Sequence, residues 1–194
     1  MMDMQVEFRG CDWILLALLC LILPLDWMAA GITAAVVHEG SHILAVRLMG
    51  GDILRLRMGI GGAVMEASEM NAWKTLISIL AGPAGSFFLL TLSGYFPKLA
   101  LCGFVQGLYN LLPVFPLDGG RALRCGLSMI AAPDLADRIC QGVQVLSVFL
   151  LITAALWASL ALKMGLIPLM ILGFLLSGIL KGKIPCKDGR FGVQ

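Results

Sequence analysis

The chain has 194 residues, of which 59% are hydrophobic and 13% are charged, and its formal net charge is +2. A soluble domain of this size would not expose so much apolar surface, so the composition predicts a polytopic membrane protein. The small net charge gives no support for binding to nucleic acid.

The first apolar run covers residues 13–25 and is short for a membrane span. We expect it either to tilt little or to thin the bilayer locally, and to return through a tight turn at residues 24–26. A removable signal peptide is not expected, because the run lacks a small-residue cleavage site and leads directly into a second span.

The second span, residues 27–46, contains only one charged side chain, that of Glu39. About 20 apolar residues are needed to cross a bilayer, so His38 falls near the middle of the membrane and His42 lies one helical turn further, on the same face. A carboxylate at this depth costs about 3 kcal/mol, which predicts that Glu39 has a function.

The pattern His38-Glu39-Gly40-Ser41-His42 has the spacing H-E-x-x-H. Two imidazoles four residues apart on a helix can bind one Zn²⁺, with the intervening Glu beside the metal-bound water. The chain has only two histidines, and both fall in this pattern. The alternative is that hydrogen bonds to neighbouring helices satisfy these side chains without a metal.

The segment after the second span predicts a small β-hairpin associated with the membrane. Residues 53–58 alternate apolar and polar side chains, glycines follow at 59, 61 and 62, and residues 63–67 resume an extended pattern. A strand edge there could pair with an extended peptide. An ordinary loop is the alternative.

A third span is expected at residues 75–92, with small residues clustered at 81–86. The cluster should interrupt the helical hydrogen bonds and let another helix approach closely, and packing alone can explain it. A fourth span is expected at residues 99–112. Asn110 lies near its end, where it could donate a hydrogen bond to a substrate or hold two helices together.

Two prolines, Pro113 and Pro116, predict irregular backbone over residues 112–120, from which Asp118 is presented. Irregular backbone at membrane depth is tolerated only when it is buried in protein or lines a watery cavity. Residues 121–138 should lie along the membrane surface, and residues 139–162 and 164–180 should form the fifth and sixth spans. Residues 181–194 form a short basic tail.

Charge predicts the orientation. With six spans, twelve Lys and Arg residues fall on one side of the membrane and only Lys98 and Lys163 on the other. The positive-inside rule then places both termini in the cytoplasm of a multi-pass cell-membrane protein. His42 and Asp118 both fall in the cytoplasmic half of the membrane.

The cysteines show no C-x-x-C spacing, so we expect them to have no chemistry. They are Cys11, Cys20, Cys102, Cys125, Cys140 and Cys186.

Two histidines and one carboxylate, with a fourth position open to water, are typical of a catalytic zinc site. Glu39 could take a proton from water and pass it to the leaving amine of a peptide bond. The sequence therefore predicts amide hydrolysis near the cytoplasmic face.

The H-E-x-x-H motif, together with residues 110–121, resembles the site-2 protease family of intramembrane zinc metalloproteases, peptidase M50. The chain is most similar to the bacterial branch of the stage IV sporulation protein FB type, over about residues 27–124. The resemblance implies one membrane metalloprotease domain covering residues 1–194. It also implies that His38, His42 and Asp118 hold zinc, that Glu39 activates water, and that Asn110 assists substrate binding.

The chain departs from the family pattern at three points. Ser41 stands where the family usually has Gly, and Ser86 stands where the third-span motif normally ends in Asn. No room follows the last span for the nucleotide-sensing (CBS) domain of many relatives, so we expect a separate regulatory subunit in the membrane.

The expected partners are therefore a membrane-protein substrate, this regulatory subunit and the lipid bilayer. The main alternative function is a membrane metal-binding or metal-transport protein, since intramembrane carboxylates and histidines also line ion pathways. An inactive scaffold that binds single-pass proteins is a third hypothesis.

Overall fold

The structure is a computed structural model that describes residues 3–5, 24–59, 62–68, 70–161 and 172–173. Residues 13–23 of the predicted first span, the basic tail and all but two residues of the sixth span lie outside the described residues. The tight turn expected at residues 24–26 needs correction, because a helix already begins at Leu25. The chain divides into two compact units, one within Met1–Asn110 with Gly189–Gln194, and the other within Leu111–Asp188.

In the first unit, helix α2 (Leu25–Leu48) contains the H-E-x-x-H motif. Its buried face repeats every fourth residue, at Ala30, Ala34, His38 and His42, because 3.6 residues complete one turn. Residues on the other faces, such as Val36 and Leu44, are exposed apolar side chains. This confirms the predicted second span as a helix long and apolar enough to cross a membrane.

Helix α2 ends at Leu48, and Gly50, two residues later, has a φ of 81° in the left-handed region. Glycine adopts this conformation without the steric cost that a Cβ imposes. The turn is closed by Gly51, whose amide donates to the carbonyl of Val46 at 2.9 Å. The ammonium of Lys74 donates to the carbonyl of Met49, so a cation lies at the negative end of the helix.

Helix α3 (Ala72–Phe88) continues into the 3₁₀ helix η1 (Leu89–Leu92), and together they form the second candidate span. Apart from Ile79, its buried face carries small or polar residues: Thr75, Ser78, Gly82, Pro83 and Ser86. Small residues let α2 and α3 pack closely, as the cluster at 81–86 predicted. The helix continues through Pro83, so the expected interruption does not end it.

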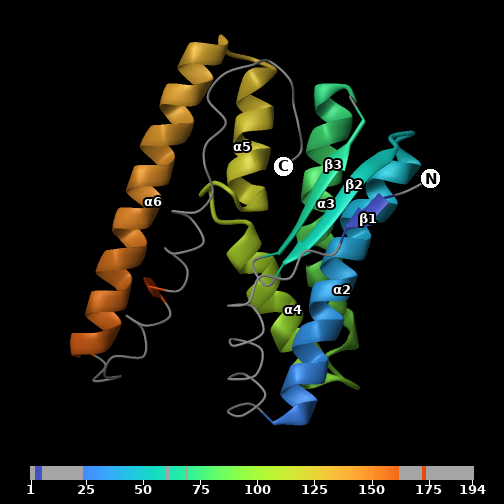
Figure 1. Cartoon of the computed structure of the whole chain (residues 1–194). Helices are drawn as coiled ribbons and strands as arrows, with labels where there is room; N and C mark the ends of the chain where they lie inside the picture. Colours follow the sequence, from blue (N-terminus) through green and yellow to red (C-terminus); the bar gives the residue numbers. More distant parts are fainter. Residues whose placement is uncertain (1–2, 6–23, 60–61, 69, 162–171, 174–194) are drawn as a thin grey trace. The chain divides into compact units, whose positions relative to one another are not determined.

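Helix α4 (Pro97–Asn110) packs against both α2 and α3 (Figure 1). Its buried residues, Ala100, Gly103 and Gly107, form one stripe of small side chains. An ion pair between Asp26 and Lys98 joins the first turns of α2 and α4. With 14 residues α4 is shorter than the roughly 20 that cross a bilayer, so the fourth span stays a prediction.

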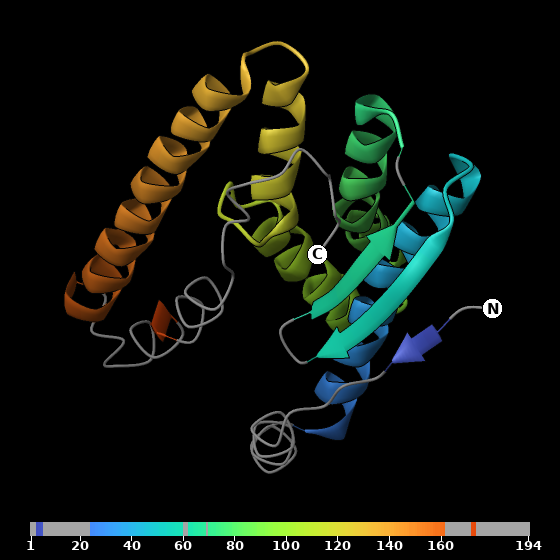
Figure 2. The same ribbon diagram turned by 45° about the horizontal axis from the view of Figure 1, so that its top comes forward.

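Three short strands belong to the same unit: β1 (Asp3–Gln5), β2 (Ile53–Gly59) and β3 (Gly62–Ala67). β2 pairs antiparallel with β3 and parallel with β1, which places β2 in the centre (Figure 2). Ile53, at the start of β2, packs with Val46 of α2. Association of these strands with the membrane stays a prediction.

In the second unit, helix α5 (Asp118–Ser128) is followed by the long helix α6 (Pro133–Ala161). The guanidinium of Arg124 donates to the carboxylate of Asp137 at 3.0 Å, which ties the two helices together. α6 is the third candidate span among the described residues and contains nearly all of the predicted fifth span.

Two predictions for this unit need correction. Irregular backbone was expected over residues 112–120, but α5 begins at Asp118, so the two following glycines are helical. Residues 121–138 were expected to form one surface segment, but Pro133 opens α6 and so its last part belongs to that helix. Proline fits the first helical position because the missing N–H has no intrahelical partner there.

Candidate metal centre

The imidazoles of His38 and His42 lie one turn apart on the buried face of α2. Their ring centroids are 5.0 Å apart and the rings are nearly perpendicular, at 85°. Only 2% of His38 and 8% of His42 is exposed. The spacing of the motif thus brings two buried rings together in the interior of the first unit.

A backbone carbonyl fixes the orientation of His42. Nδ1 of His42 donates to the carbonyl oxygen of Ser78 at 2.8 Å. Because a carbonyl only accepts, Nδ1 must carry a proton, and in the neutral ring the lone pair is then on Nε2. Hydrogen bonding of one ring nitrogen to a carbonyl is typical of a histidine that binds metal through the other.

A hydroxyl group faces the corresponding atom of His38. Nδ1 of His38 and Oγ of Ser86 are 2.8 Å apart, and Ser86 is completely buried. The serine lies in α3, 48 residues away in the sequence. Each histidine of the motif is therefore hydrogen-bonded by a different serine of α3.

Gly82 of α3 faces the ring of His42. A Cβ at this position would stand 2.7 Å from Cδ2 of His42 and would also collide with Nε2 and Cε1. Real Cβ atoms do not approach other atoms so closely, so only glycine fits beside this edge of the ring.

Glu39 follows His38 on α2 and is half-buried, as expected for a residue about 100° around the helix from the histidine stripe. Asn110 is the last residue of α4 and is also half-buried. The described contacts assign no hydrogen bond to the amide of Asn110, so its part in substrate binding stays a prediction.

Asp118 belongs to the second unit, where it is the first residue of α5 and is 94% buried. A carboxylate is favoured there because the amides at a helix N-terminus carry partial positive charge. The guanidinium of Arg121 lies 3.5 Å from one of its oxygens. The helix thus holds an anionic oxygen donor in a buried position.

The donor set of these residues suits zinc. Zinc in proteins binds neutral imidazole and carboxylate, and metal-binding histidines need their second nitrogen hydrogen-bonded. Both histidines meet this requirement through Ser78 and Ser86. Neither contact was predicted from the sequence, in which the cluster of small residues in the third span was the signal that pointed to this region.

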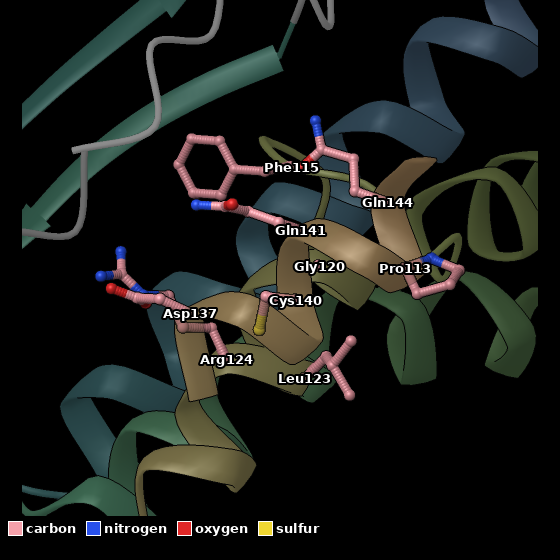
Figure 3. Close-up of a pocket in the computed structure, with 9 residues that line it drawn as sticks. All are labelled: Pro113, Phe115, Gly120, Leu123, Arg124, Asp137, Cys140, Gln141 and Gln144. Atoms are coloured by element: carbon pink, nitrogen blue, oxygen red, sulfur yellow. The ribbon is translucent and has the colours of Figure 1, made fainter. Parts of the chain in front are cut away.

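A separate pocket lies within the second unit, between α5, α6 and the loop before α5 (Figure 3). The Arg124–Asp137 pair lies at one side, with Phe115 and Gln144 at the other. None of its nine lining residues is a predicted site residue.

The chain is similar to known zinc metalloproteases. The sequence profile of Peptidase family M50 matches residues 60–154. A zinc metalloprotease of Methanocaldococcus jannaschii is 34% identical over 110 residues, which cover 49% of this chain and 32% of that protein. A Synechocystis protein named as a zinc metalloprotease is 28% identical over 154 residues, 69% of this chain and 38% of that protein.

The fold is that of a solved site-2 protease from Methanocaldococcus jannaschii. The TM-score is 0.67 at 22% identity, with 98% of this chain and 96% of the other covered. The chain is thus a membrane protein built on the site-2 protease fold. Residues 60–154 match the model of Peptidase family M50, and the chain is similar to proteins named as zinc metalloproteases. It spans about a third of the length of the curated relatives it matches, and its place in the sporulation branch stays a prediction.

Proposed function

We propose that this protein is an intramembrane zinc metalloprotease that hydrolyses a peptide bond of a membrane-spanning or membrane-associated protein. The cut falls near the cytoplasmic face of the cell membrane. The chain crosses this membrane several times, with six spans, a membrane-associated β-hairpin and both termini in the cytoplasm.

One observation carries the proposal. In a helix long and apolar enough to cross a membrane, two imidazoles one turn apart are both buried, and each has Nδ1 hydrogen-bonded to a serine of α3. Burying two polar imidazoles costs free energy. Because the hydrogen bond at Nδ1 orients each ring as in metal-binding histidines, the arrangement favours Nε2 as the metal-binding atom.

We assign the zinc ligands to Nε2 of His38, Nε2 of His42 and a carboxylate oxygen of Asp118. When bound, zinc supplies Lewis acidity that makes water a nucleophile near neutral pH. Three protein ligands would leave a further position on a bound zinc for water or substrate, as in other catalytic zinc sites.

Glu39 moves the proton in this account. Its carboxylate takes a proton from water as the oxygen attacks the substrate carbonyl carbon, and returns it to the amide nitrogen as the C–N bond breaks. The products are a carboxylate and an amine. Asn110 donates a hydrogen bond to the substrate or to the developing oxyanion.

The substrate segment has to be extended, because a helical carbonyl is already hydrogen-bonded and is enclosed by side chains. The edge of the strand pair that follows α2 holds this extended segment by backbone hydrogen bonds. A separate membrane subunit regulates access.

The experiment that tests this function compares cells that contain the wild-type protein with cells that contain Glu39→Gln. The amide cannot act as a base but has nearly the size of the carboxylate. We expect the purified variant to keep its zinc while one membrane protein accumulates uncut in quantitative proteomics.

Asp134→Asn is the matched control, because Asp134 is an exposed carboxylate in the first turn of α6. It should cleave like the wild type. Cleavage that persists in Glu39→Gln would refute the assignment, and flux of zinc into proteoliposomes that persists in this variant would favour transport instead.

A further inference from the structure

The two serines that contact the histidine pair do so in chemically different ways. Ser78 accepts the hydrogen bond of His42 through its backbone carbonyl, whereas Ser86 faces Nδ1 of His38 with its side-chain hydroxyl. Only the second contact depends on the identity of the residue, because every residue has a backbone carbonyl.

Among the described residues, the hydroxyl of Ser86 has a hydrogen-bond partner and that of Ser78 has none. Oγ of Ser86 lies 2.8 Å from Nδ1 of His38, while within the described part of the chain Oγ of Ser78 is buried without a hydrogen-bond partner. The two serines are two helical turns apart on the same face of α3 and are both more than 90% buried. They form a matched pair that differs in this one contact.

Helix α4 holds Ser86 in place. A Cβ on Gly103 would stand 2.7 Å from the carbonyl oxygen of Ser86, and a Cβ on Gly107 would stand 3.2 Å from its Cβ. The backbone of α4 therefore lies directly against this residue, which leaves little room for its side chain to move.

We propose that Ser86 is a positioning residue for the metal centre: its hydroxyl oxygen accepts a hydrogen bond from the Nδ1–H of His38 and so presents Nε2 of that ring to zinc. The inference rests on the proposed zinc site. A hydroxyl can donate a hydrogen bond as well as accept one, whereas the carbonyl of Ser78 can only accept. The Ser86 contact alone therefore does not exclude the tautomer of His38 that has its proton on Nε2. Zinc binding selects the tautomer in which Ser86 accepts.

The role is distinct from substrate binding. Ser86 is completely buried and its only described hydrogen bond goes to His38, so it acts on the ligand and not on the peptide. Removing the partner of a metal-binding histidine typically weakens metal affinity about 10–100-fold.

The test uses the full chain purified in detergent, with zinc titrated against a chromophoric chelator. We expect Ser86→Ala to bind zinc about 10–100-fold more weakly than the wild type. Ser78→Ala should bind like the wild type, because its carbonyl remains and the lost hydroxyl had no partner.

The visible spectrum of the cobalt-substituted protein separates positioning from a merely structural role, because it reports the geometry of the metal ligands. The bands should shift in Ser86→Ala and stay unchanged in Ser78→Ala. Ser86→Cys keeps a side chain of similar size with a weaker acceptor, so its affinity should lie between those of serine and alanine. If Ser86→Ala does not fold, Ser86→Cys takes its place in the zinc titration.

Wild-type zinc affinity together with an unchanged cobalt spectrum in the Ser86 variants would overturn the inference. A wild-type chain that binds no zinc would overturn the proposed zinc site, and this inference with it. The two failures are thus distinguished by the wild-type titration alone.

Discussion

Gly82 of α3 lies directly against the imidazole of His42, at a distance that no other residue could keep. The Cβ of any other residue would stand 2.7 Å from Cδ2 of that ring and would collide with Nε2 as well. The absence of a side chain at position 82 is therefore a condition for the orientation of a proposed zinc ligand.

We expect Gly82→Ala to displace the ring of His42 and to lower zinc affinity at least about tenfold, as perturbed histidine orientation does elsewhere. Chelator competition on the purified protein measures this. Gly31→Ala on α2 is the control, since a Cβ there meets no atom within 4 Å. Equal affinities in the two variants would show that the contact with His42 is unimportant.

Asp118 and Asp134 both lie in the first turn of a helix, but Asp118 is buried and Asp134 is exposed. Each carboxylate is stabilised by the partial positive charge of its helix N-terminus, so the two Asp→Asn changes remove a similar interaction with the helix. If Asp118 is a ligand, Asp118→Asn should lose zinc on dialysis while Asp134→Asn keeps it. Metal analysis of both proteins decides, and zinc retained by Asp118→Asn would remove this residue from the proposed ligands.

Gly119 and Gly120 allow α5 to start directly against the preceding loop. A Cβ at Gly119 would collide with the carbonyl groups of Leu111 and Leu112, and one at Gly120 would stand 2.6 Å from the carbonyl carbon of Val114. We expect Gly119→Ala to lower the free energy of unfolding by about 1–3 kcal/mol, as overpacking does.

Gly126→Ala in the same helix is the control, because a Cβ there meets nothing within 4 Å. Alanine favours a helix over glycine by up to about 1 kcal/mol, so this change should stabilise slightly. Denaturant unfolding in micelles would measure both. A change of the same sign in both variants would contradict the packing argument.

Burial raises the pKa of the Cys125 thiol, and the nearby charge of Arg121 offsets this only in part. The thiolate is the reactive form, so in the folded protein alkylation of Cys125 should begin at higher pH than in the unfolded chain. Peptide mass spectrometry after N-ethylmaleimide treatment over a pH series measures the shift. Identical pH profiles in folded and unfolded protein would contradict it.

The sequence predicted the histidine helix correctly because its signal is local. A run of 20 residues with a single charge indicates a membrane helix, and the four-residue spacing of His38 and His42 places them on one face. The small residues at 81–86 also predicted close packing, which the structure shows at Gly82 and Gly85.

The contacts of Ser78 and Ser86 could not be predicted, since each depends on how α3 is placed beside α2 in three dimensions. Ser86 was noted only as a departure from the family pattern. The start of α5 was misjudged for a related reason. Pro113 and Pro116 indicated irregular backbone as far as residue 120, but the helix begins at Asp118. Gly119 and Gly120 allow it to start in close contact with the loop, and tertiary packing overrides their low helix propensity.

The central claim, that zinc is held by the imidazoles of α2 and a carboxylate, is tested most directly by the zinc K-edge X-ray absorption spectrum of the purified protein. We predict two imidazole ligands at about 2.0 Å, further oxygen ligands at a similar distance, and no sulfur. A spectrum with cysteine sulfur at about 2.3 Å, or one without paired imidazoles, would contradict the account.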